Sequence, residues 1–462
     1  MQFSIRYLSS LVRSRRRFSF LFFISLFLLI IFILFNIHNK NQSIDFLLNR
    51  NQELISTKNE SLILNTLITK TTTIIQKKGL WPVDKKGRSL KTNFLALDLT
   101  GFFGTDVTEG AHTQCTSSNT TFTWTRQKDR INEVDFVICH GAPNGLDSYV
   151  LRLQLNNEQQ QYTMGYIIES EAHSSTGDNW AKYNFKMTYN LDDSYPEPAT
   201  YFDANLHIID LLKPPSIPFE EKEKQADIVW IISNCNAHNS REGFVQRLMQ
   251  EIKIDSYGTC LNNRKGYAAR MTDNIHAYKK YKFVIAIENS NCVDYVTEKL
   301  IKAVESGSIP IVAGRDGRPD YRRFMPEHAY INIYDYKSIK DLANDLKRIA
   351  NNKTLYESYL WYKKHNKNIS QLSKVTLDEK IKHFVDVIGS NATMITHGII
   401  EKEKSEDKIC KLIRFVRQTS WQDIAVHHGT PRIGPDIACL PRGSLLTYFD
   451  SLSSNSNQTM KS

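Results

Sequence analysis

The chain has 462 residues and a formal net charge of +10 at pH 7, with 41% hydrophobic and 23% charged residues. This length exceeds that of one small domain, and the composition excludes a wholly disordered chain. The positive charge suits an anionic ligand, a membrane surface or nucleic acid, and it does not choose among them.

An uncharged apolar run near the N-terminus, Phe18–Ile37, predicts a transmembrane helix. At 1.5 Å per residue, a helix of about twenty residues crosses the roughly 30 Å hydrocarbon core. Arginines precede the run and few positive charges follow it, so we expect residues 1–17 in the cytosol and the rest in the lumen. A cleaved signal peptide is the alternative, but the run is long and no small-residue cleavage site follows it.

Residues 38–91 have the composition of a stem that holds the body away from the membrane. Scattered leucines leave open a weak helical pairing, and hence a homodimer through the stem. A lumenal body agrees with several N-x-S/T acceptor sites and favours disulfides among the seven cysteines. The odd count leaves at least one thiol free or paired between chains. No C-x-x-C pair occurs, so zinc is not expected, and neither is nucleic acid as a partner.

Residues 92–217 are expected to form a first domain. Short apolar runs bounded by Gly, Asn, Asp or Ser predict its strands; these runs are Phe94–Asp98, Val134–His140, Met164–Ser170 and Phe185–Asn190. A linker with three prolines, Lys213–Lys224, follows.

Residues 218–400 are expected to form a second domain in which strands and helices alternate. Strands are predicted over Asp227–Asn234, Lys253–Gly258, Tyr281–Glu288 and Ile309–Gly314, and helices over Arg241–Ile252 and Tyr295–Gly307. Such units predict α/β domains with parallel sheets, and two domains joined by a linker predict a cleft between them. Residues 401–462 are expected to be a C-terminal extension whose last dozen residues are disordered.

Two loops of the second domain, residues 233–241 and 288–299, lead from strands into helices. Ligands of parallel sheets bind at such loops. Each loop places a cation, Arg241 or Lys299, in the first turn of its helix, where it opposes the helix dipole. An anion held between these cations would explain both positions, and the alternative is that both side chains point to water.

Neither a G-x-x-x-x-G-K-[ST] loop nor a G-x-G-x-x-G fingerprint occurs, which disfavours nucleoside triphosphatases and dinucleotide enzymes. No Asp-x-Asp pair occurs either, so a bound nucleoside diphosphate would have to be neutralised by protein cations instead of a metal ion. In the first domain, Glu169 ends an apolar strand and could accept a proton from a hydroxyl. The alternative is a surface carboxylate.

The run YKFVIAIENSNCVDYVTEKLIKAVESGSIPIVAG closely resembles the donor-binding domain of the α-1,3-fucosyltransferase family, and ENS…DYVTEKL is its most specific part. Upstream, VWIISNCNAHNSREGFVQRL resembles the family's first donor-domain strand, loop and helix. YIIESEAHS resembles an acceptor-domain landmark more loosely. The resemblance covers residues 94–364.

This resemblance implies a GT-B fold, in which two Rossmann-like domains face each other across a cleft. It implies a type II enzyme of the Golgi membrane that transfers fucose from GDP-fucose to an N-acetylglucosamine hydroxyl of a glycoprotein or glycolipid glycan, with inversion and without an obligatory metal or other cofactor. Glu169 matches the general base of the family. The residues that match its GDP-fucose site are Asn234, Arg241, Tyr257, Asn289, Glu298 and Lys299.

Several positions depart from the family pattern, among them Glu171 and Asn190, so the acceptor glycan is open. A protein O-fucosyltransferase and a catalytically silent lectin or scaffold are the alternative functions. The family's closely spaced C-terminal cysteines are missing, so Cys410 and Cys439 could pair with Cys115 or Cys139. Cys235 and Cys260 follow two neighbouring predicted strands and could pair with each other.

Overall fold

The computed structural model describes residues 81–101, 107–141, 161–174, 183–199, 201, 211–265, 274–364, 376, 379, 382, 385–386, 407–426 and 438–459. The predicted cytosolic tail, the predicted membrane span over residues 18–37 and most of the predicted stem lie outside these residues. Within the described part, no helix combines the length and the apolar character that a membrane span needs. Residues 77–462 form one compact unit.

The first sheet has six strands in the order β2-β3-β1-β4-β5-β6. They are β1 (Asn93–Asp98), β2 (His112–Cys115), β3 (Thr120–Thr125), β4 (Phe136–His140), β5 (Tyr162–Ile167) and β6 (Phe185–Thr188). β2 runs antiparallel to β3, and the other neighbours are parallel. The sequence predicts β1, β4, β5 and β6. It misses the edge strand β2, which is polar and mostly exposed, and its neighbour β3, which is rich in Thr and only partly buried.

The second sheet has five parallel strands in the order β11-β10-β9-β7-β8. They are β7 (Ile228–Trp230), β8 (Ile254–Ser256), β9 (Phe283–Ile285), β10 (Ile309–Val312) and β11 (Ile331–Asn332). The chain passes from β7 to β8 on one side and then to β9 on the other side of β7. The carboxyl ends of β7 and β9 therefore flank a topological switch point, the usual ligand site of such sheets.

Helices cover both faces of this sheet, and the side chains of each strand, which point alternately to the two faces, divide between two cores. Val229, Val284 and Val312 join the core with α7 (Ile275–Tyr278) and α8 (Glu298–Glu305). The alternate positions join the core with α6 (Arg241–Glu251), α9 (Ile339–Ala350) and α10 (Lys353–Tyr359), and the short α11 (Trp361–Lys364) follows. The described residues also contain short 3-10 turns: η1 (Lys128–Asn132), η4 (Phe219–Glu221), η5 (Tyr321–Arg323) and η6 (Ile333–Asp335).

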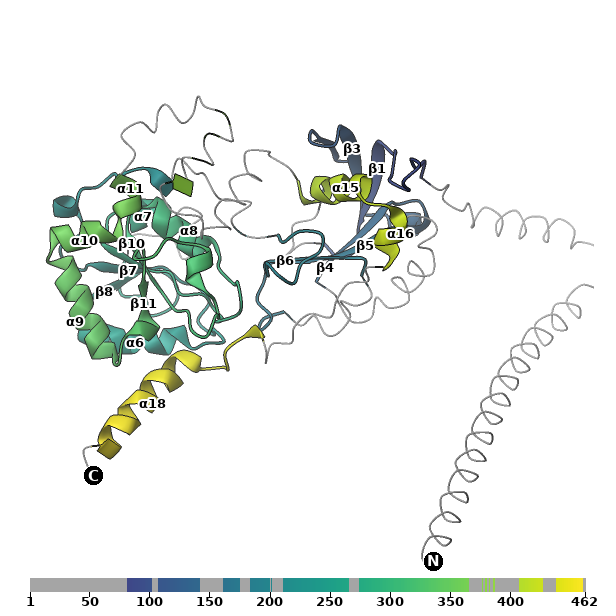
Figure 1. Ribbon diagram of the computed structural model, residues 1–462. Coiled ribbons are helices and arrows are strands. Elements are labelled where there is room, and N and C mark those ends of the chain that lie inside the picture. The colour runs from purple at the N-terminus through teal and green to yellow at the C-terminus, as the bar shows by residue number, and fades with distance from the viewer. Residues whose placement is uncertain are drawn as a thin grey trace, which may run out of the picture. The chain divides into compact units, whose positions relative to one another are not determined.

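The C-terminal region completes the cores of both sheets and is not a separate extension. In α15 (Lys408–Gln418), Ile409, Leu412 and Ile413 are buried in the core of the first sheet, and α16 (Trp421–Val426) follows. The helix α18 (Ser444–Thr459) lies beside α6 (Figure 1). Its Leu445 and Phe449 are buried in the core of the second sheet. The prediction of disorder from residue 451 is wrong as far as Thr459, where α18 ends, because Leu445 and Phe449 anchor the start of this helix in the core.

Three disulfides link Cys115 to Cys410, Cys235 to Cys260 and Cys292 to Cys439, and Cys139 is a buried free thiol. The pairing of Cys235 with Cys260 is confirmed, and so is Cys115 as a partner of Cys410. The expected partners of Cys439 are wrong. The segment that contains Cys439 runs antiparallel to the loop after β9, and this brings it to Cys292.

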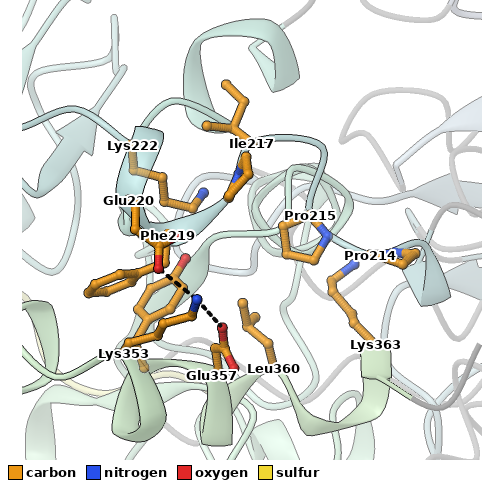
Figure 2. Close-up of a pocket in the computed structure, with 12 residues that line it drawn as sticks. Pro214, Pro215, Ile217, Phe219, Glu220, Lys222, Lys353, Glu357, Leu360 and Lys363 are labelled. Carbon is orange, nitrogen blue, oxygen red and sulfur yellow. Dashed lines mark hydrogen bonds and ion pairs between the residues drawn. The ribbon is translucent and has the colours of Figure 1, made fainter.

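The linker between the two sheets covers a pocket of about 570 Å³ (Figure 2). Its walls include Pro214, Pro215 and Leu360, and Lys353 pairs with Glu220 there at 2.6 Å. Lys222 is buried, and its Nζ donates to the carbonyls of Lys279 and Tyr281 at 3.0 Å each. Burial, with a smaller contribution from the charge of Lys282, lowers the pKa of Lys222 to about 7 from its ordinary 10.5.

We expect Lys222 to make the free energy of unfolding rise with pH between about 7 and 10.5. In this window the unfolded chain binds a proton that the folded chain does not, so the sign is positive. In Lys222→Met the rise is less steep, because this proton is missing from both states. Denaturant titrations of both proteins across the window measure the difference, and parallel curves would contradict the expectation.

Candidate functional site

The site is assembled at the switch point, where the loops after β7 and β9 lie side by side. Arg241 is the first residue of α6 and is 1% exposed. Its guanidinium donates to the carbonyl of Ile287 at 2.9 Å and to that of Asn234 at 3.3 Å, so it bridges the two loops. Burial lowers the pKa of Arg241, and nearby carboxylates, Glu288 foremost, oppose this. An arginine stays protonated in such an environment.

A buried carboxylate, Glu288, holds the start of α8. It accepts hydrogen bonds from the backbone N–H of Thr297 at 2.8 Å and from its hydroxyl at 2.9 Å. Lys299 Nζ lies 3.1 Å from Glu288 and 3.2 Å from Glu298. Burial raises the pKa of Glu288 despite the opposing effect of Lys299. Burial disfavours the charge of Lys299, but the two carboxylates outweigh it and raise its pKa.

The cations at the two helix starts are therefore already partly neutralised. Lys299 does not point to water, since its ammonium group contacts Glu288, Glu298 and Thr297. The unfavourable interaction of Arg241 and Lys299 with the helix dipoles is thus offset by Glu288, which the sequence argument did not single out. An anionic ligand would bind here by competing with these carboxylates for the cations.

Glu169 follows β5 and reaches the second sheet's loop. Its Oε1 accepts a hydrogen bond from Tyr295 Oη at 2.7 Å and from the backbone N–H of Ser170 at 2.8 Å. Asn289 Nδ2 lies 3.4 Å from the same oxygen. The carboxylate predicted as a base is therefore in contact with the loop that leads into Glu298 and Lys299. It is not a remote surface group.

Two further contacts join the loop after β9 to the chain of the first sheet. The hydroxyls of Ser170 and Ser290 are 3.0 Å apart and buried. Asp294 accepts a hydrogen bond from the backbone N–H of Leu191, which follows β6, and pairs with Arg323 at 2.9 Å. The loop after β9 is thus fixed against the chain that follows both β5 and β6.

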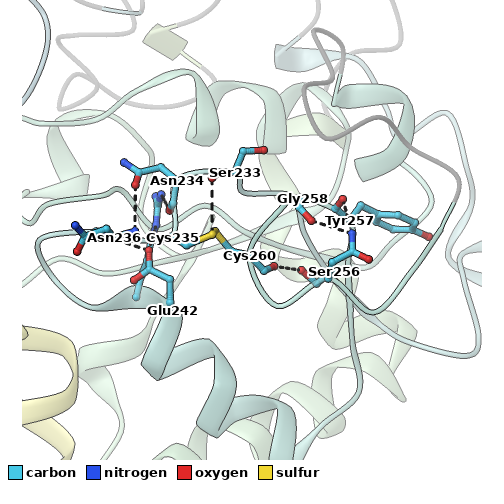
Figure 3. Close-up of a disulfide and its surroundings, with 12 residues drawn as sticks. Ser233, Asn234, Cys235, Asn236, Glu242, Ser256, Tyr257, Gly258 and Cys260 are labelled. Atoms are coloured by element: carbon cyan, nitrogen blue, oxygen red, sulfur yellow. Dashed lines mark hydrogen bonds and ion pairs between the residues drawn. A yellow bond between two sulfur atoms is a disulfide. The ribbon is translucent and has the colours of Figure 1, made fainter.

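Asn234 and Tyr257 lie on the two sides of the Cys235–Cys260 disulfide (Figure 3). The exposed Asn234 accepts a hydrogen bond from the backbone N–H of Asn236, and its own carbonyl contacts Arg241. The Tyr257 hydroxyl is 2.8 Å from the Tyr281 hydroxyl, which donates to Asp255. Among the predicted residues, Arg241 thus contacts Asn234, and Glu169 contacts Asn289. The hydroxyl of Tyr257 instead contacts Tyr281, which belongs to neither pair.

Two residues of the site, Glu288 and Tyr295, were missed by the sequence argument. A carboxylate at the end of a buried apolar strand was the available signal for Glu288. Tyr295 is part of the DYVTEKL motif, but nothing in the sequence indicates which carboxylate its hydroxyl contacts. Its pKa is raised well above 10, first by burial and then by the charge of Glu169, so the hydroxyl remains a donor at physiological pH.

Among the described residues, the atoms of Glu171, Cys292 and Cys439 form a cluster of metal-ligand types within 4.8 Å. The two sulfur atoms are joined in a disulfide and are not thiolates, the form that binds metal ions. This cluster is therefore not a candidate metal centre while the disulfide is intact.

Residues 221–423 match the family described as glycosyltransferase family 10 (fucosyltransferase) C-term. Alpha-(1,3)-fucosyltransferase C of Drosophila melanogaster is 32% identical over 201 residues, which are 40% of this chain and 45% of that protein. Alpha-(1,3)-fucosyltransferase 4 of Bos taurus is 30% identical over 202 residues, 43% of this chain and 49% of that protein. The chain thus spans about half the length of these curated relatives. The matches confirm the resemblance found in the sequence.

A crystal structure of an α1,3-fucosyltransferase with GDP-fucose is similar at a TM-score of 0.43 and 17% identity, over 68% of this chain and 95% of that chain. A TM-score this low adds no argument about the fold, which rests on the two sheets themselves.

We expect Glu288→Ala to lower the free energy of unfolding by about 3–5 kcal/mol, because Lys299 and Thr297 lose their buried partner. The exposed Glu327 is the matched control, and Glu327→Ala should change stability by no more than about 0.5 kcal/mol. Chemical denaturation measures both. Equal, small effects of the two substitutions would show that the Glu288 carboxylate does not hold the helix start.

Proposed function

We propose, from the match of residues 221–423 to the C-terminal domain of the fucosyltransferases of glycosyltransferase family 10, that the protein is an α-1,3-fucosyltransferase. It transfers fucose from GDP-fucose to an N-acetylglucosamine hydroxyl of a glycoprotein or glycolipid glycan. The observation that carries the proposal is the contact of Glu169 with Tyr295 and Asn289. This contact puts a carboxylate that can accept a proton beside the loop with the family's most specific motif.

The donor would bind at the carboxyl ends of β7 and β9, where the amides at the starts of α6 and α8 favour an anion. Arg241 and Lys299 are the cations for the diphosphate. Lys299 changes partner most easily, because its ammonium group ends a flexible chain and its side chain is 18% exposed. Asn234, Asn289, Glu298 and Tyr257 are the other residues for GDP-fucose, by their resemblance to family positions. Tyr257 would offer its ring, since its hydroxyl is engaged with Tyr281.

In the proposed reaction, the acceptor hydroxyl oxygen forms a bond to the anomeric carbon of fucose as the bond from that carbon to the β-phosphate oxygen breaks. The proton of the hydroxyl passes to Glu169, and GDP leaves with the electron pair. Attack from the face opposite the leaving group inverts the anomeric centre. The sugar has oxocarbenium character in the transition state, as in other glycosyl transfers. Arg241 and Lys299 stabilise the charge that develops on GDP.

The proposed setting is the Golgi membrane, with a type II anchor at residues 18–37, a stem at residues 38–91 and the catalytic part in the lumen. The two sheets would form the two Rossmann-like domains of a GT-B fold, residues 92–217 for the acceptor and 218–400 for the donor. A homodimer through the stem belongs to the same proposal. The three disulfides suit an oxidising compartment.

The direct test incubates the protein with GDP-fucose and separate glycan and peptide acceptors. Fucosylation of N-acetylglucosamine in a Lewis-type acceptor or in an N-glycan core supports the proposal. Transfer to Ser or Thr of a peptide would identify a protein O-fucosyltransferase. GDP binding without turnover on any acceptor would identify a silent lectin or scaffold.

We expect Glu169→Gln to abolish transfer and to leave GDP binding intact, because the amide cannot accept the proton while the donor loop keeps its cations.

We expect Lys299→Ala to weaken GDP binding and to lower kcat/KM by about 10²–10³. Lys302→Ala, on the same helix, is the control for a lost lysine. Calorimetry with GDP and transfer assays measure both effects, and normal turnover of Glu169→Gln would contradict the role of the base.

We expect EDTA to leave turnover unchanged, because protein cations take the place of a metal ion in this account. Turnover assays in metal-free buffer, with and without added manganese, measure this. A loss of activity with EDTA that manganese restores would contradict it.

A further inference from the structure

Residues 438–445, named here the C-terminal strap, lie across both loops of the candidate donor site. At the loop after β9, the backbone N–H of Val293 donates to the carbonyl of Ala438 at 2.8 Å, and that of Leu440 donates to the carbonyl of Asn291 at 2.8 Å. Cys292 and Cys439 form an antiparallel bridge between these bonds and are joined by a disulfide.

The same strap continues to the loop after β7. The backbone N–H of Gly443 donates to the carbonyl of His238 at 2.9 Å, and that of Leu445 donates to the carbonyl of Asn239 at 3.3 Å. The side chain of Arg442 donates to Asn236 Oδ1 at 2.9 Å. Eight consecutive residues therefore connect the loop that leads to Arg241 with the loop that leads to Lys299. They lie outside the region that matches the family, residues 221–423.

The disulfide also packs against Tyr295, which donates a hydrogen bond to the proposed base. Cys292, Cys439 and Ala438 share a buried cluster with Tyr189 and Tyr295. The two tyrosine rings meet edge to face, with centroids 4.9 Å apart. Tyr295 donates to Glu169, so a displacement of Cys292 would move the hydrogen-bond donor of that carboxylate.

We propose that the C-terminal strap is a positioning element of the donor site. It holds the two loops in register and fixes Tyr295 against Glu169, and the Cys292–Cys439 disulfide is its principal tie. Loops without a regular ladder of their own need such ties, since each unrestrained residue loses conformational entropy when a ligand orders it. For its effect on catalysis the inference rests on the proposed function.

The alternative is that this disulfide only stabilises the fold by restricting the unfolded chain. The Cys115–Cys410 disulfide is the matched control, because it joins residues 295 apart, against 147 for Cys292–Cys439, and lies in the core of the first sheet. A purely stabilising role predicts at least as large an effect from loss of the Cys115–Cys410 link.

The test is amide hydrogen exchange of the full chain in Cys292→Ser/Cys439→Ser and in Cys115→Ser/Cys410→Ser. We expect exchange in residues 234–240 and 288–297 to quicken by about tenfold or more only in the first variant. Unchanged exchange in these loops, or equal acceleration in the control, would overturn the proposal. This readout needs no nucleotide, so it decides the inference even if the wild-type protein fails to bind GDP and the proposed function fails.

Arg442→Ala keeps the disulfide and tests the strap if the cysteine variant does not fold. We expect its KM for GDP-fucose to rise by roughly three- to tenfold through the loss of one charge-assisted hydrogen bond, with the KM for the acceptor unchanged. Arg442→Lys, which can still donate to Asn236, should recover part of the loss. Equal changes in both KM values, or no change in either, would contradict a positioning role at the donor loops.

Discussion

The hydrogen bond from Tyr295 to Glu169 is the interaction on which the candidate site depends, because it joins a loop of each sheet. It places the proposed base directly against the proposed donor loop. The bond is supported on both sides. Ser170 contacts Ser290 next to it, and Asp294 ties the same loop to Leu191 and Arg323. The neighbouring Cys292–Cys439 disulfide packs against Tyr295 and continues this support into the C-terminal strap.

The two cations of the candidate donor site, Arg241 and Lys299, depend on compensation of their charge by nearby carboxylates. Arg241 and Lys299 are charged groups with little access to water, and such groups persist only when partners are close. Glu288 is such a partner, and its own burial raises its pKa. A diphosphate would therefore enter a site whose cations are already arranged around a carboxylate. Little reorganisation of the backbone would be needed, since Thr297 and Glu288 already hold the start of α8 in place.

The sequence predicted the elements that are apolar and regular, and it missed those defined by their partners. All the strands expected in the second domain are present, because parallel strands buried on both faces leave a continuous apolar signal. β2 and β3 gave no such signal, since their side chains are polar or half exposed. The serine-rich end of α18 has the composition of a disordered tail, but Leu445 and Phe449 anchor its start in the core.

The site residues divide in the same way. Arg241, Lys299 and Glu169 could be found because a charge stood at a strand end or helix start, and Asn289 and Glu298 because they belong to a recognisable motif. Cys439 as partner of Cys292, and Tyr295 as partner of Glu169, depend on contacts between residues more than a hundred positions apart. Periodicity and spacing carry no information about such contacts.

The most direct test of the central claim is a calorimetric comparison of GDP, GMP and guanosine binding to the wild-type protein. If Arg241 and Lys299 hold a diphosphate, GDP must bind far more tightly than GMP, and the difference must shrink as salt screens the charges. Equal affinities for GDP and GMP would contradict the account, because the second phosphate would then make no contact with these cations.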